Sequence, residues 1–304
     1  MKILVTGGAG FIGSHIVDSY ISKGHDVVIL DNLYSGNKEN INKKAVFYQM
    51  DVTDKNISKI FEKEKFDVVN HHAAQMNVRF SVENPLFDAN VNVLGILNLL
   101  DNCKKYGVKK FIFASSGGAV YGDKDKYPIS EEESRRPDSP YGMSKKISED
   151  YINYYHRTCG LKYICLRYPN VYGPRQTPHG EAGVIAIFLG LLLQDKDVQI
   201  YGDGGQIRDY IFVSDVVEVN NLALSNDNNY FNVGTGVPTS VNQIYRKLKE
   251  ISKSKGNYVN VPKKEGDVMK NYINSDKARK LLGWKYKIDL DEGLRLTYEW
   301  FKNK

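Results

Sequence analysis

The stretch TGGAGFIGSH, residues 6–15, follows a short apolar run at residues 2–6 and leads into a segment with helical periodicity. Three glycines, Gly7, Gly10 and Gly13, recur in it at every third position. Glycines at this spacing allow a tight turn after a strand, a close approach of the backbone to a pyrophosphate, and a helix start with exposed N–H groups. The stretch therefore predicts a dinucleotide-binding turn between a first strand and a first helix.

Short β-rich segments alternate with longer amphipathic ones through the first half of the chain. We expect strands at residues 2–6, 27–31, 46–50, 67–74, 110–116 and 163–168, and helices near residues 11–23, 54–64, 89–106 and 141–159. This alternation predicts an α/β fold, a doubly wound parallel sheet with ligands bound beyond the carboxyl ends of its strands.

Beyond Tyr168 the pattern loosens into loops that contain proline and glycine, followed by helical segments near residues 183–194, 240–252 and 290–302. We therefore expect an NAD-binding domain of the Rossmann type over residues 1–168. Residues 169–304 are expected to form mainly a smaller substrate-binding domain, with segments that return to the sheet.

The ends of the next strands favour one dinucleotide over another. The second expected strand ends in Asp31, whose carboxylate can accept hydrogen bonds from the adenosine ribose and would repel a 2′-phosphate, so NAD is favoured over NADP. Asp51 and Val52, after the third strand, are expected beside the adenine. Ala73 and Ala74 are small enough to let the cofactor pass, although the same pair could serve close helix packing instead.

Composition argues against several other classes of protein. The chain has 304 residues, of which 41% are apolar, as expected for a packed globular protein. Its three cysteines form no CxxC pair, so neither a disulfide framework nor a metal site is predicted. Its lysines are scattered despite a net charge of +6, which does not favour nucleic-acid binding. We find no leader pattern and no run of roughly 18 apolar residues, and expect a cytoplasmic protein without membrane association.

Tyrosine and lysine four residues apart can form a proton-transfer pair, but the spacing alone is weak evidence in a chain with 21 tyrosines. Five such pairs occur: Tyr34/Lys38, Tyr106/Lys110, Tyr141/Lys145, Tyr245/Lys249 and Tyr298/Lys302. Only Tyr141/Lys145 is expected to begin a helix beside the cofactor, because Ser139 can cap that helix and Pro140 suits its first position.

The strand before this helix ends in Ser115 and Ser116, so a hydroxyl, a phenol and an ammonium can converge at the carboxyl edge of the sheet. A free tyrosine, with a pKa near 10, is a poor base, but the Lys145 ammonium and a positively charged nicotinamide would favour its phenolate. We expect Tyr141 to act as the base, Ser116 to hold the reacting oxygen, and Lys145 also to bind the nicotinamide ribose. The alternative is an ordinary exposed helix face.

Taken together, these residues resemble the extended short-chain dehydrogenase/reductases, and within them the nucleotide-sugar epimerases and dehydratases. The resemblance extends over essentially the whole chain, through TGGAGFIGSH, DNLYSG, HHAAQ, SSGGAVYG, SPYGMSK, LRYPNVYGPRQ, GDGGQIRDYIFVSD, FNVGTG and KARKLLGW. The chain is most similar to the group of UDP-glucose (UDP-galactose) 4-epimerases, and in particular to compact members with PHGEAGV, which is residues 178–184 here.

The resemblance implies two sets of contacts. The cofactor, NAD, would be held by Gly7, Gly10, Phe11, Ile12, Gly13, Asp31, Asn32, Asp51, Val52, Ala73, Ala74, Asn92, Tyr141, Lys145 and Tyr168, with Pro169 near the nicotinamide. A UDP-sugar substrate would be held by Ser116, Asn170, Gln199, Tyr201, Arg208, Lys264 and Asn271. It also implies a homodimer formed through the helices near residues 89–106 and 141–159.

Two of these assignments carry an alternative or a departure from the family pattern. Arg208 could form a salt bridge with Asp209 or Asp215 instead of binding a phosphate. Lys264 stands where many epimerases have a second arginine, and a point charge makes a less specific phosphate contact than a planar guanidinium.

Residues after the strand-end serine help to choose the reaction. Related dehydratases carry an Asp-Glu pair there and decarboxylases a glutamate, whereas this chain has Gly117, Gly118 and Ala119. The expected reaction is therefore the 4-epimerisation of a UDP-hexose through a transient 4-keto sugar, with NAD tightly bound. The alternatives are another NAD-dependent nucleotide-sugar dehydratase, decarboxylase or reductase, or a non-catalytic NAD(P)-binding regulator.

One position bears on substrate breadth. A position near the hexose that is tyrosine in some epimerases falls on Asn271, which leaves room for an N-acetyl group, so UDP-N-acetylglucosamine and UDP-N-acetylgalactosamine are expected to be accepted too. A shift of one residue in the alignment would place Tyr272 there instead.

Overall fold

The computed structural model describes residues 1–178, 183–263 and 268–304. Its main sheet has seven strands in the order β11-β6-β5-β4-β1-β2-β3, and every pair in it is parallel. The strands are β1 (Lys2–Thr6), β2 (Asp26–Asp31), β3 (Val46–Gln49), β4 (Val68–His71), β5 (Lys110–Ser116), β6 (Lys162–Tyr168) and β11 (Asn229–Asn232). The predicted doubly wound α/β fold is confirmed.

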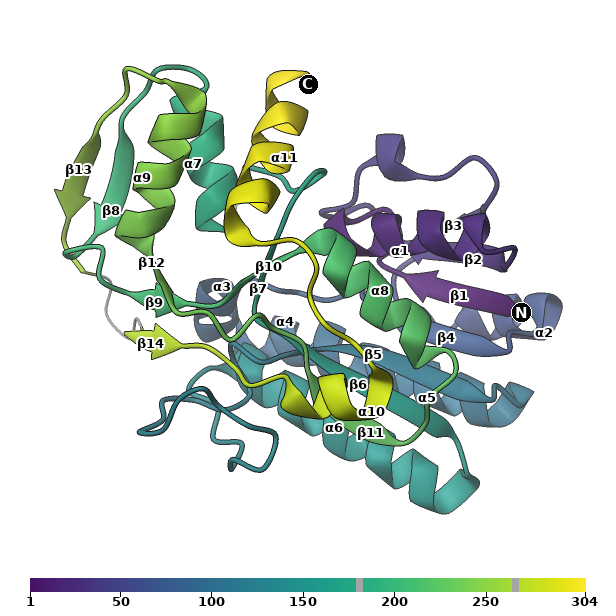
Figure 1. The fold of residues 1–304 in the computed structure, drawn as a ribbon. Helices are drawn as coiled ribbons and strands as arrows, with labels where there is room; N and C mark the ends of the chain where they lie inside the picture. The colour runs from purple at the N-terminus through teal and green to yellow at the C-terminus, as the bar shows by residue number, and fades with distance from the viewer. Residues whose placement is uncertain (179–182, 264–267) are drawn as a thin grey trace.

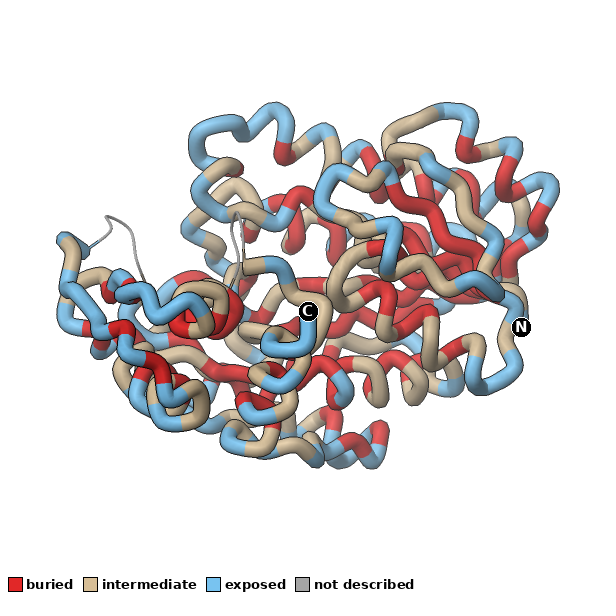
Figure 2. The backbone as a smooth tube through the Cα atoms, turned by 90° about the horizontal axis from the view of Figure 1, so that it is seen from above, coloured by how far each residue is buried: buried red, intermediate tan, exposed pale blue. Residues whose placement is uncertain are grey.

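Helices cover both faces of this sheet (Figure 1). One face packs against α1 (Phe11–Ser22), α8 (Val213–Ala223) and α10 (Asp276–Leu282), and the other against α2 (Ile57–Glu64), α5 (Gly95–Tyr106) and α6 (Pro140–Cys159). Successive residues of a strand alternate between the two cores: Ile3 and Val5 lie in the first and Leu4 in the second. Because both faces are buried, the strands are almost continuously apolar in sequence, and Figure 2 shows the buried segments gathered in the interior with exposed segments around them.

A smaller lobe lies at the upper left of Figure 1 and has a core of its own. It contains α7 (Val184–Leu192), α9 (Val241–Ser252), α11 (Leu290–Lys302), β8 (Val198–Tyr201) and β13 (Tyr258–Val261). Short strands connect it with the main sheet: β7 (Asn170–Tyr172), β9 (Ile207–Arg208), β10 (Tyr210–Phe212), β12 (Thr239–Ser240) and β14 (Lys270–Asn271). The chain returns to the main sheet at β11, which pairs with β6.

Some elements differ from the expectation. The helix expected at residues 89–106 is three consecutive pieces, α4 (Pro85–Ala89), a π-helical turn (Asn90–Leu94) and α5, and it is preceded by α3 (Val78–Glu83). The strand expected at residues 67–74 ends at His71, and the helix expected from residue 54 begins at Ile57. A 3-10 turn, Lys38–Asn40, lies in the loop after β2. Among the described residues, no helix is long and apolar enough to cross a membrane.

The order of strands places the ligand crevice. The chain winds from β1 toward β2 and β3 on one side, and from β4 toward β5 and β6 on the other. Ligands of such sheets bind at this switch point, beyond the carboxyl ends of the strands. The loop after β1 and the loop after β4 meet there, since a Cβ atom on Gly7 would lie 2.6 Å from the backbone nitrogen of Ala73. The residues that follow β1, β4, β5 and β6 are therefore the place to look for a site.

Candidate active site

The glycine turn after β1 has a conformation that side chains would block. Gly7 has φ +69°, in the left-handed region, and a Cβ atom on Gly13 would lie 2.2 Å from the carbonyl oxygen of Gly7. Gly10 is the N-cap of α1 and places no side chain over the first turn of the helix. The N–H groups at the start of α1 can therefore face a phosphate, as a dinucleotide requires.

Two carboxylates lie beyond this turn, where the ribose and adenine were predicted. Asp31 is 6% exposed and accepts hydrogen bonds from the backbone nitrogens of Ala9 (3.0 Å) and Leu33 (2.8 Å), so it lies against the glycine turn. Asp51 accepts from Thr53 and from the Asn32 amide (2.6 Å). Partial burial acts to raise the pKa of Asp51, but these hydrogen bonds outweigh it and lower that pKa, which keeps the carboxylate ionised.

The helix α6 begins as its sequence predicts. Ser139 is the N-cap, its hydroxyl accepts a hydrogen bond from the backbone nitrogen of Gly142 at 3.2 Å, and Pro140 is the first helical residue. Tyr141 and Lys145 lie on one face, with the Lys145 ammonium 5.7 Å from the centre of the Tyr141 ring. This ammonium also donates to the carbonyl oxygen of Ala114, at 2.9 Å, which places it beside the end of β5.

Burial dominates the electrostatics of this pair. Burial raises the pKa of Tyr141 to about 12, a hydrogen bond with Ser116 opposes the rise, and the charge of Asp88 adds to it. Burial lowers the pKa of Lys145 to about 8, against the charges of Asp88 and Glu149. The hydroxyl of Ser116, the phenol and the ammonium therefore meet at the carboxyl edge of β5, as predicted from the sequence.

Ser115 does not join them, which corrects the expectation that both strand-end hydroxyls project into the site. Ser115 is buried, and its hydroxyl donates to Glu149 Oε1 at 2.6 Å. Neighbouring residues of a strand point to opposite faces, so only one of the two serines can face the ligand.

Three of the predicted sugar-binding residues, Asn170, Arg208 and Asn271, lie on the short strands β7, β9 and β14. Arg208 on β9 is in register with Asn271 on β14, and the Asn271 amide donates to the carbonyl oxygen of Gly118 at 3.4 Å, two residues beyond Ser116. Asn170 is in register with Tyr210. The carboxylate of Asp209, one of the two salt-bridge alternatives for Arg208, accepts hydrogen bonds from Thr235, Gly236 and Ile273, and that of Asp215 accepts from Lys287 and Ile288.

Asn271 and Tyr272 point in different directions. Asn271 is 3% exposed, and its Oδ1 atom has no hydrogen-bond partner among the described residues. Tyr272 stacks on Tyr127 with ring centres 5.3 Å apart. Of the two candidates raised by the alignment, Asn271 is therefore the one that lies beside the loop after Ser116.

Other predicted contacts lie farther along the smaller lobe or outside the described residues. Gln199 and Tyr201 lie two apart on β8, hence on one face, and pair with β13. The carbonyl oxygen of Tyr201 accepts from Gln206, which leads into β9. Lys264 and residues 179–182 of the PHGEAGV segment lie outside the described residues.

Further predicted cofactor contacts are tied into internal hydrogen bonds. Asn92 is 4% exposed and exchanges hydrogen bonds with the backbone of Gln75. The hydroxyl of Tyr168 accepts from Asn220 at 2.8 Å, and its ring stacks on His72. The side chain of Val52 is in the core, while Ala73 and Ala74 continue from β4 beside the glycine turn.

Three buried groups near this site were not predicted from the sequence: the carboxylates of Asp88 on α4 and Glu149 on α6, and the imidazole of His72. Asp88 and Glu149 are fully buried, and both act electrostatically on Lys145. An acidic residue in an amphipathic helix is normally exposed, so no signal in a single sequence distinguishes these two from surface carboxylates. The pair HH before Ala73 in a strand context was a usable signal for His72.

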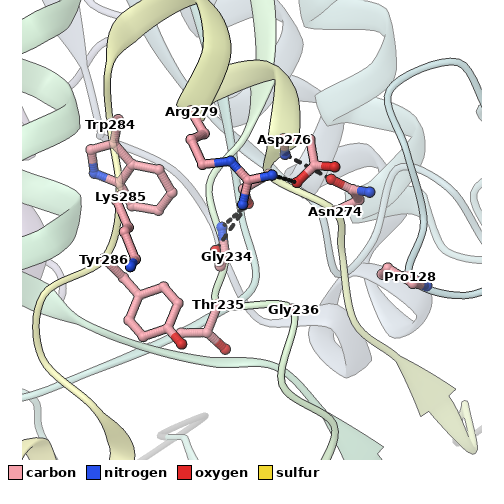
Figure 3. Close-up of a pocket in the computed structure, with 11 residues that line it drawn as sticks. Pro128, Gly234, Thr235, Gly236, Asn274, Asp276, Arg279, Trp284, Lys285 and Tyr286 are labelled. Carbon is pink, nitrogen blue, oxygen red and sulfur yellow. Dashed lines mark hydrogen bonds and ion pairs between the residues drawn. The ribbon is translucent and has the colours of Figure 1, made fainter.

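A separate cavity of about 160 Å³ lies between α10, the segment 234–236 and residues 284–286 (Figure 3). Arg279 at this cavity is paired with Asp276 at 2.7 Å, and Gly234 exchanges hydrogen bonds with Ser275. None of the residues predicted to bind NAD or the sugar lines it, so it is not the candidate active site. Among the described residues, no group of three or more His, Cys, Asp or Glu could hold a metal ion.

The parallel sheet with an open glycine turn at its switch point defines a dinucleotide-binding fold of the Rossmann class, and the Ser, Tyr and Lys groups lie beside that turn. Residues 3–234 match the model of the NAD dependent epimerase/dehydratase family, and the chain belongs to that family. It is 49% identical over 301 residues to a putative UDP-glucose 4-epimerase of Methanocaldococcus jannaschii, covering 99% of this chain and 98% of that protein.

Two solved structures are similar over nearly their whole length. The UDP-glucose 4-epimerase of Thermotoga maritima with UDP-glucose superposes with a TM-score of 0.98 at 49% identity, covering 100% of this chain and 99% of that one. The UDP-glucose 4-epimerase of Thermus thermophilus in complex with NAD has a TM-score of 0.95 at 43% identity, covering 99% of each chain.

Substitution of Gly13 by alanine should abolish retention of the dinucleotide, because the added Cβ would collide with the carbonyl oxygen of Gly7. The purified Gly13→Ala protein should lack the cofactor absorbance that the wild type carries. Gly24→Ala is the matched control: its φ of +79° makes the substitution strained, but no atom lies within 4 Å of the new Cβ. A Gly13→Ala protein with a full complement of dinucleotide would show that the turn is not the binding site.

Proposed function

We propose that this protein interconverts UDP-glucose and UDP-galactose by reversible 4-epimerisation, with NAD retained in the site. The observation that carries the proposal is the convergence of Ser116, Tyr141 and Lys145 at the carboxyl edge of β5, next to a turn shaped for a dinucleotide. The loop that follows Ser116 is Gly117, Gly118 and Ala119, which offers no carboxylate for a dehydration or decarboxylation step.

The residues of the turn fit the cofactor. Side chains at Gly7 and Gly13 would collide with neighbouring backbone, so their absence allows the tight turn. The N–H groups of α1 would bind the pyrophosphate, and Asp31 would bind the adenosine ribose. Lys145 would hold the nicotinamide ribose beside Tyr141. When bound there, NAD can accept a hydride from C4 of the sugar and give it back.

The protein's own groups handle the proton. The Tyr141 phenolic oxygen takes the proton of the sugar 4-hydroxyl, Ser116 Oγ holds the same sugar oxygen by a hydrogen bond, and the Lys145 ammonium favours the phenolate. The 4-keto sugar then rotates within the site, and Tyr141 returns the proton to the oxygen at C4, which becomes the new 4-hydroxyl. Arg208 and Asn170 would hold the diphosphate and uridine during this rotation, because a guanidinium binds phosphate through two N–H groups.

The reaction is tested by proton NMR of the purified protein with UDP-galactose and no added NAD. We expect UDP-glucose to appear, and the rate to fall about 10²–10⁴-fold in Tyr141→Phe, which keeps the ring but removes the acid–base group. Tyr151→Phe, on the same helix, is the matched control and should leave the rate unchanged. A wild type that oxidises or dehydrates the sugar once NAD is supplied, without giving UDP-glucose, would contradict the proposal.

The same site is proposed to accept N-acetylated sugars. Asn271 is buried beside Gly118, and its Oδ1 atom has no hydrogen-bond partner among the described residues. A buried acceptor of this kind is costly unless a ligand supplies a donor, and a hydroxyl or an acetamido N–H of the sugar is a suitable one. The side chain is also smaller than the tyrosine found at this place in some epimerases.

Replacing Asn271 by tyrosine should fill this space. We expect kcat/KM for UDP-N-acetylgalactosamine to fall about 10–200-fold relative to that for UDP-galactose, the usual range for added bulk in a pocket. Tyr272→Phe is the control, since Tyr272 stacks on Tyr127 and should leave the ratio unchanged. If Asn271→Tyr left the ratio as it was, the assignment of Asn271 to the hexose pocket would be wrong.

We further propose that two copies of the chain associate through α5 and α6. These helices pack side by side, and their neighbourhood carries exposed apolar side chains, including Leu94 (56%), Tyr151 (37%) and Tyr154 (50%). Large apolar side chains left exposed at one helix pair are typical of an interface. In a two-fold symmetric dimer, the α5–α6 pair of one copy would pack against the α5–α6 pair of the other.

Light scattering on the eluted protein should give twice the mass of one chain. Tyr154→Lys should shift the mass toward the monomer, because a charge would be buried at the interface. Leu281→Lys changes a side chain of similar exposure (57%) on α10 and should leave the dimer intact. A dimer that withstands Tyr154→Lys would have to use another surface.

Three broader expectations stay part of this proposal. Residues 1–168 would form the NAD-binding domain and residues 169–304 mainly the substrate-binding domain. The protein would act in galactose metabolism in the cytoplasm, a setting that suits its three free cysteines, Cys103, Cys159 and Cys165.

A further inference from the structure

Two fully buried carboxylates, Glu149 on α6 and Asp88 on the neighbouring α4, differ in how their charge is balanced. Glu149 is paired with two guanidinium groups, those of Arg135 (2.9 Å) and Arg167 (2.6 Å). Asp88 on α4 has no such partner among the described residues. Its Oδ1 accepts from the amides of Gln75 (2.8 Å) and Asn92 (2.9 Å), and its Oδ2 accepts from the Ser144 hydroxyl (2.6 Å).

Three donors to two oxygens is the pattern of an ionised carboxylate, and none of the three donors is charged. An ionised group at 0% exposure is costly unless a charge of opposite sign lies nearby. The position of the donor Ser144 indicates where that opposite charge lies. Tyr141, Ser144 and Lys145 lie three and four residues apart on one face of α6, so the carboxylate of Asp88 is against the face that carries Tyr141 and Lys145.

Lys145 in turn lacks an anion among its hydrogen-bond partners in the described part of the chain. It is 4% exposed, its ammonium donates to the neutral carbonyl of Ala114, and it lies over the ring of Phe113. Lys145 and Asp88 are thus two buried ions on the same side of α6, each surrounded by neutral groups.

The other titratable groups around Lys145 are either neutral or paired with other charges. On α6 itself they are Tyr141, whose pKa is raised to about 12 chiefly by burial, and Glu149, which is held by two guanidinium groups. From the end of β4 they are His71 and His72, whose pKa values burial lowers well below the usual range, so both imidazoles are neutral near pH 7. Glu149 also acts on Lys145, but it is paired with two guanidinium groups, so among the described residues Asp88 is the nearby anion whose hydrogen-bond partners are all neutral.

We propose that Asp88 is a positioning residue of the active site, whose carboxylate is the counter-charge that keeps Lys145 an ammonium beside Tyr141. The proposal rests on the roles proposed above for Tyr141 and Lys145. In support, the Asp88 charge opposes the effect of burial, which lowers the pKa of Lys145 to about 8. Without Asp88 that pKa would fall further, and Lys145 would be largely neutral. It would then no longer supply the ammonium that favours the Tyr141 phenolate.

The first test is the pH dependence of kcat in Asp88→Asn, which keeps the shape of the side chain and removes its charge. The alkaline fall of kcat should move to lower pH by about one unit or more, the usual effect of removing a nearby opposite charge. Asp215→Asn is the matched control: Asp215 is 2% exposed and also bonded by neutral donors, but those donors are the backbone N–H groups of Lys287 and Ile288 in another part of the fold. An unchanged profile in Asp88→Asn would overturn the proposal.

The second test needs no activity, so it separates this proposal from the proposed reaction. Free energies of unfolding are measured for Asp88→Asn, Lys145→Met and the double variant. Each single change leaves one buried charge without its counter-charge, so the double variant should be more stable than the sum of the two losses predicts. Strict additivity would show that the two charges do not interact, and would refute the proposal even if the protein were an epimerase.

Discussion

The position of α6, the helix that carries Tyr141 and Lys145, depends on one buried carboxylate, that of Glu149. It accepts hydrogen bonds from Ser115 on β5, from Arg167 on β6 and from Arg135 in the loop before α6. The carboxylate therefore ties together two strands of the sheet, the helix and the loop that leads into it. Breaking such a buried pair usually costs about 3–5 kcal/mol, because an unpaired charge is left behind.

This arrangement explains why Tyr141 and Lys145 face Ser116. Glu149 lies one helical turn after Lys145, so fixing Glu149 to the ends of β5 and β6 sets the rotation of α6 about its axis. Ser115 is used for that purpose, while Ser116, on the opposite face, is left to the site. Structural and chemical roles are thus divided between two adjacent serines by the alternation of a strand.

The charges near the Tyr141 phenol act in opposite directions on its ionisation. Burial acts against the charged form of both Tyr141 and Lys145, and Asp88 also disfavours the phenolate of Tyr141. The opposing charge is the Lys145 ammonium, which lies 5.7 Å from the centre of the Tyr141 ring. A phenol that gives up its proton and takes it back in one catalytic cycle needs such a balance, since a phenolate that is too stable would not return the proton.

Local sequence was sufficient for the features that depend on neighbouring residues. The glycine turn, the capped start of α6 and the strands of the main sheet follow from spacing and periodicity, and the structure confirms them. The short strands β9 and β14 were not foreseen, because two-residue strands have no periodicity and are held by pairing with distant segments. The burial of Asp88 and Glu149 was missed for the same reason: it depends on which segments the fold brings together.

In the proposed reaction one hydrogen leaves C4 of the sugar as a hydride, stays in the site and returns to the same carbon. UDP-galactose carrying deuterium at C4 tests it directly in ordinary water. We expect UDP-glucose that retains the deuterium at C4, with none released to the solvent. Loss of the label to water, or its retention in a product that has lost water or carbon dioxide, would contradict 4-epimerisation by this route.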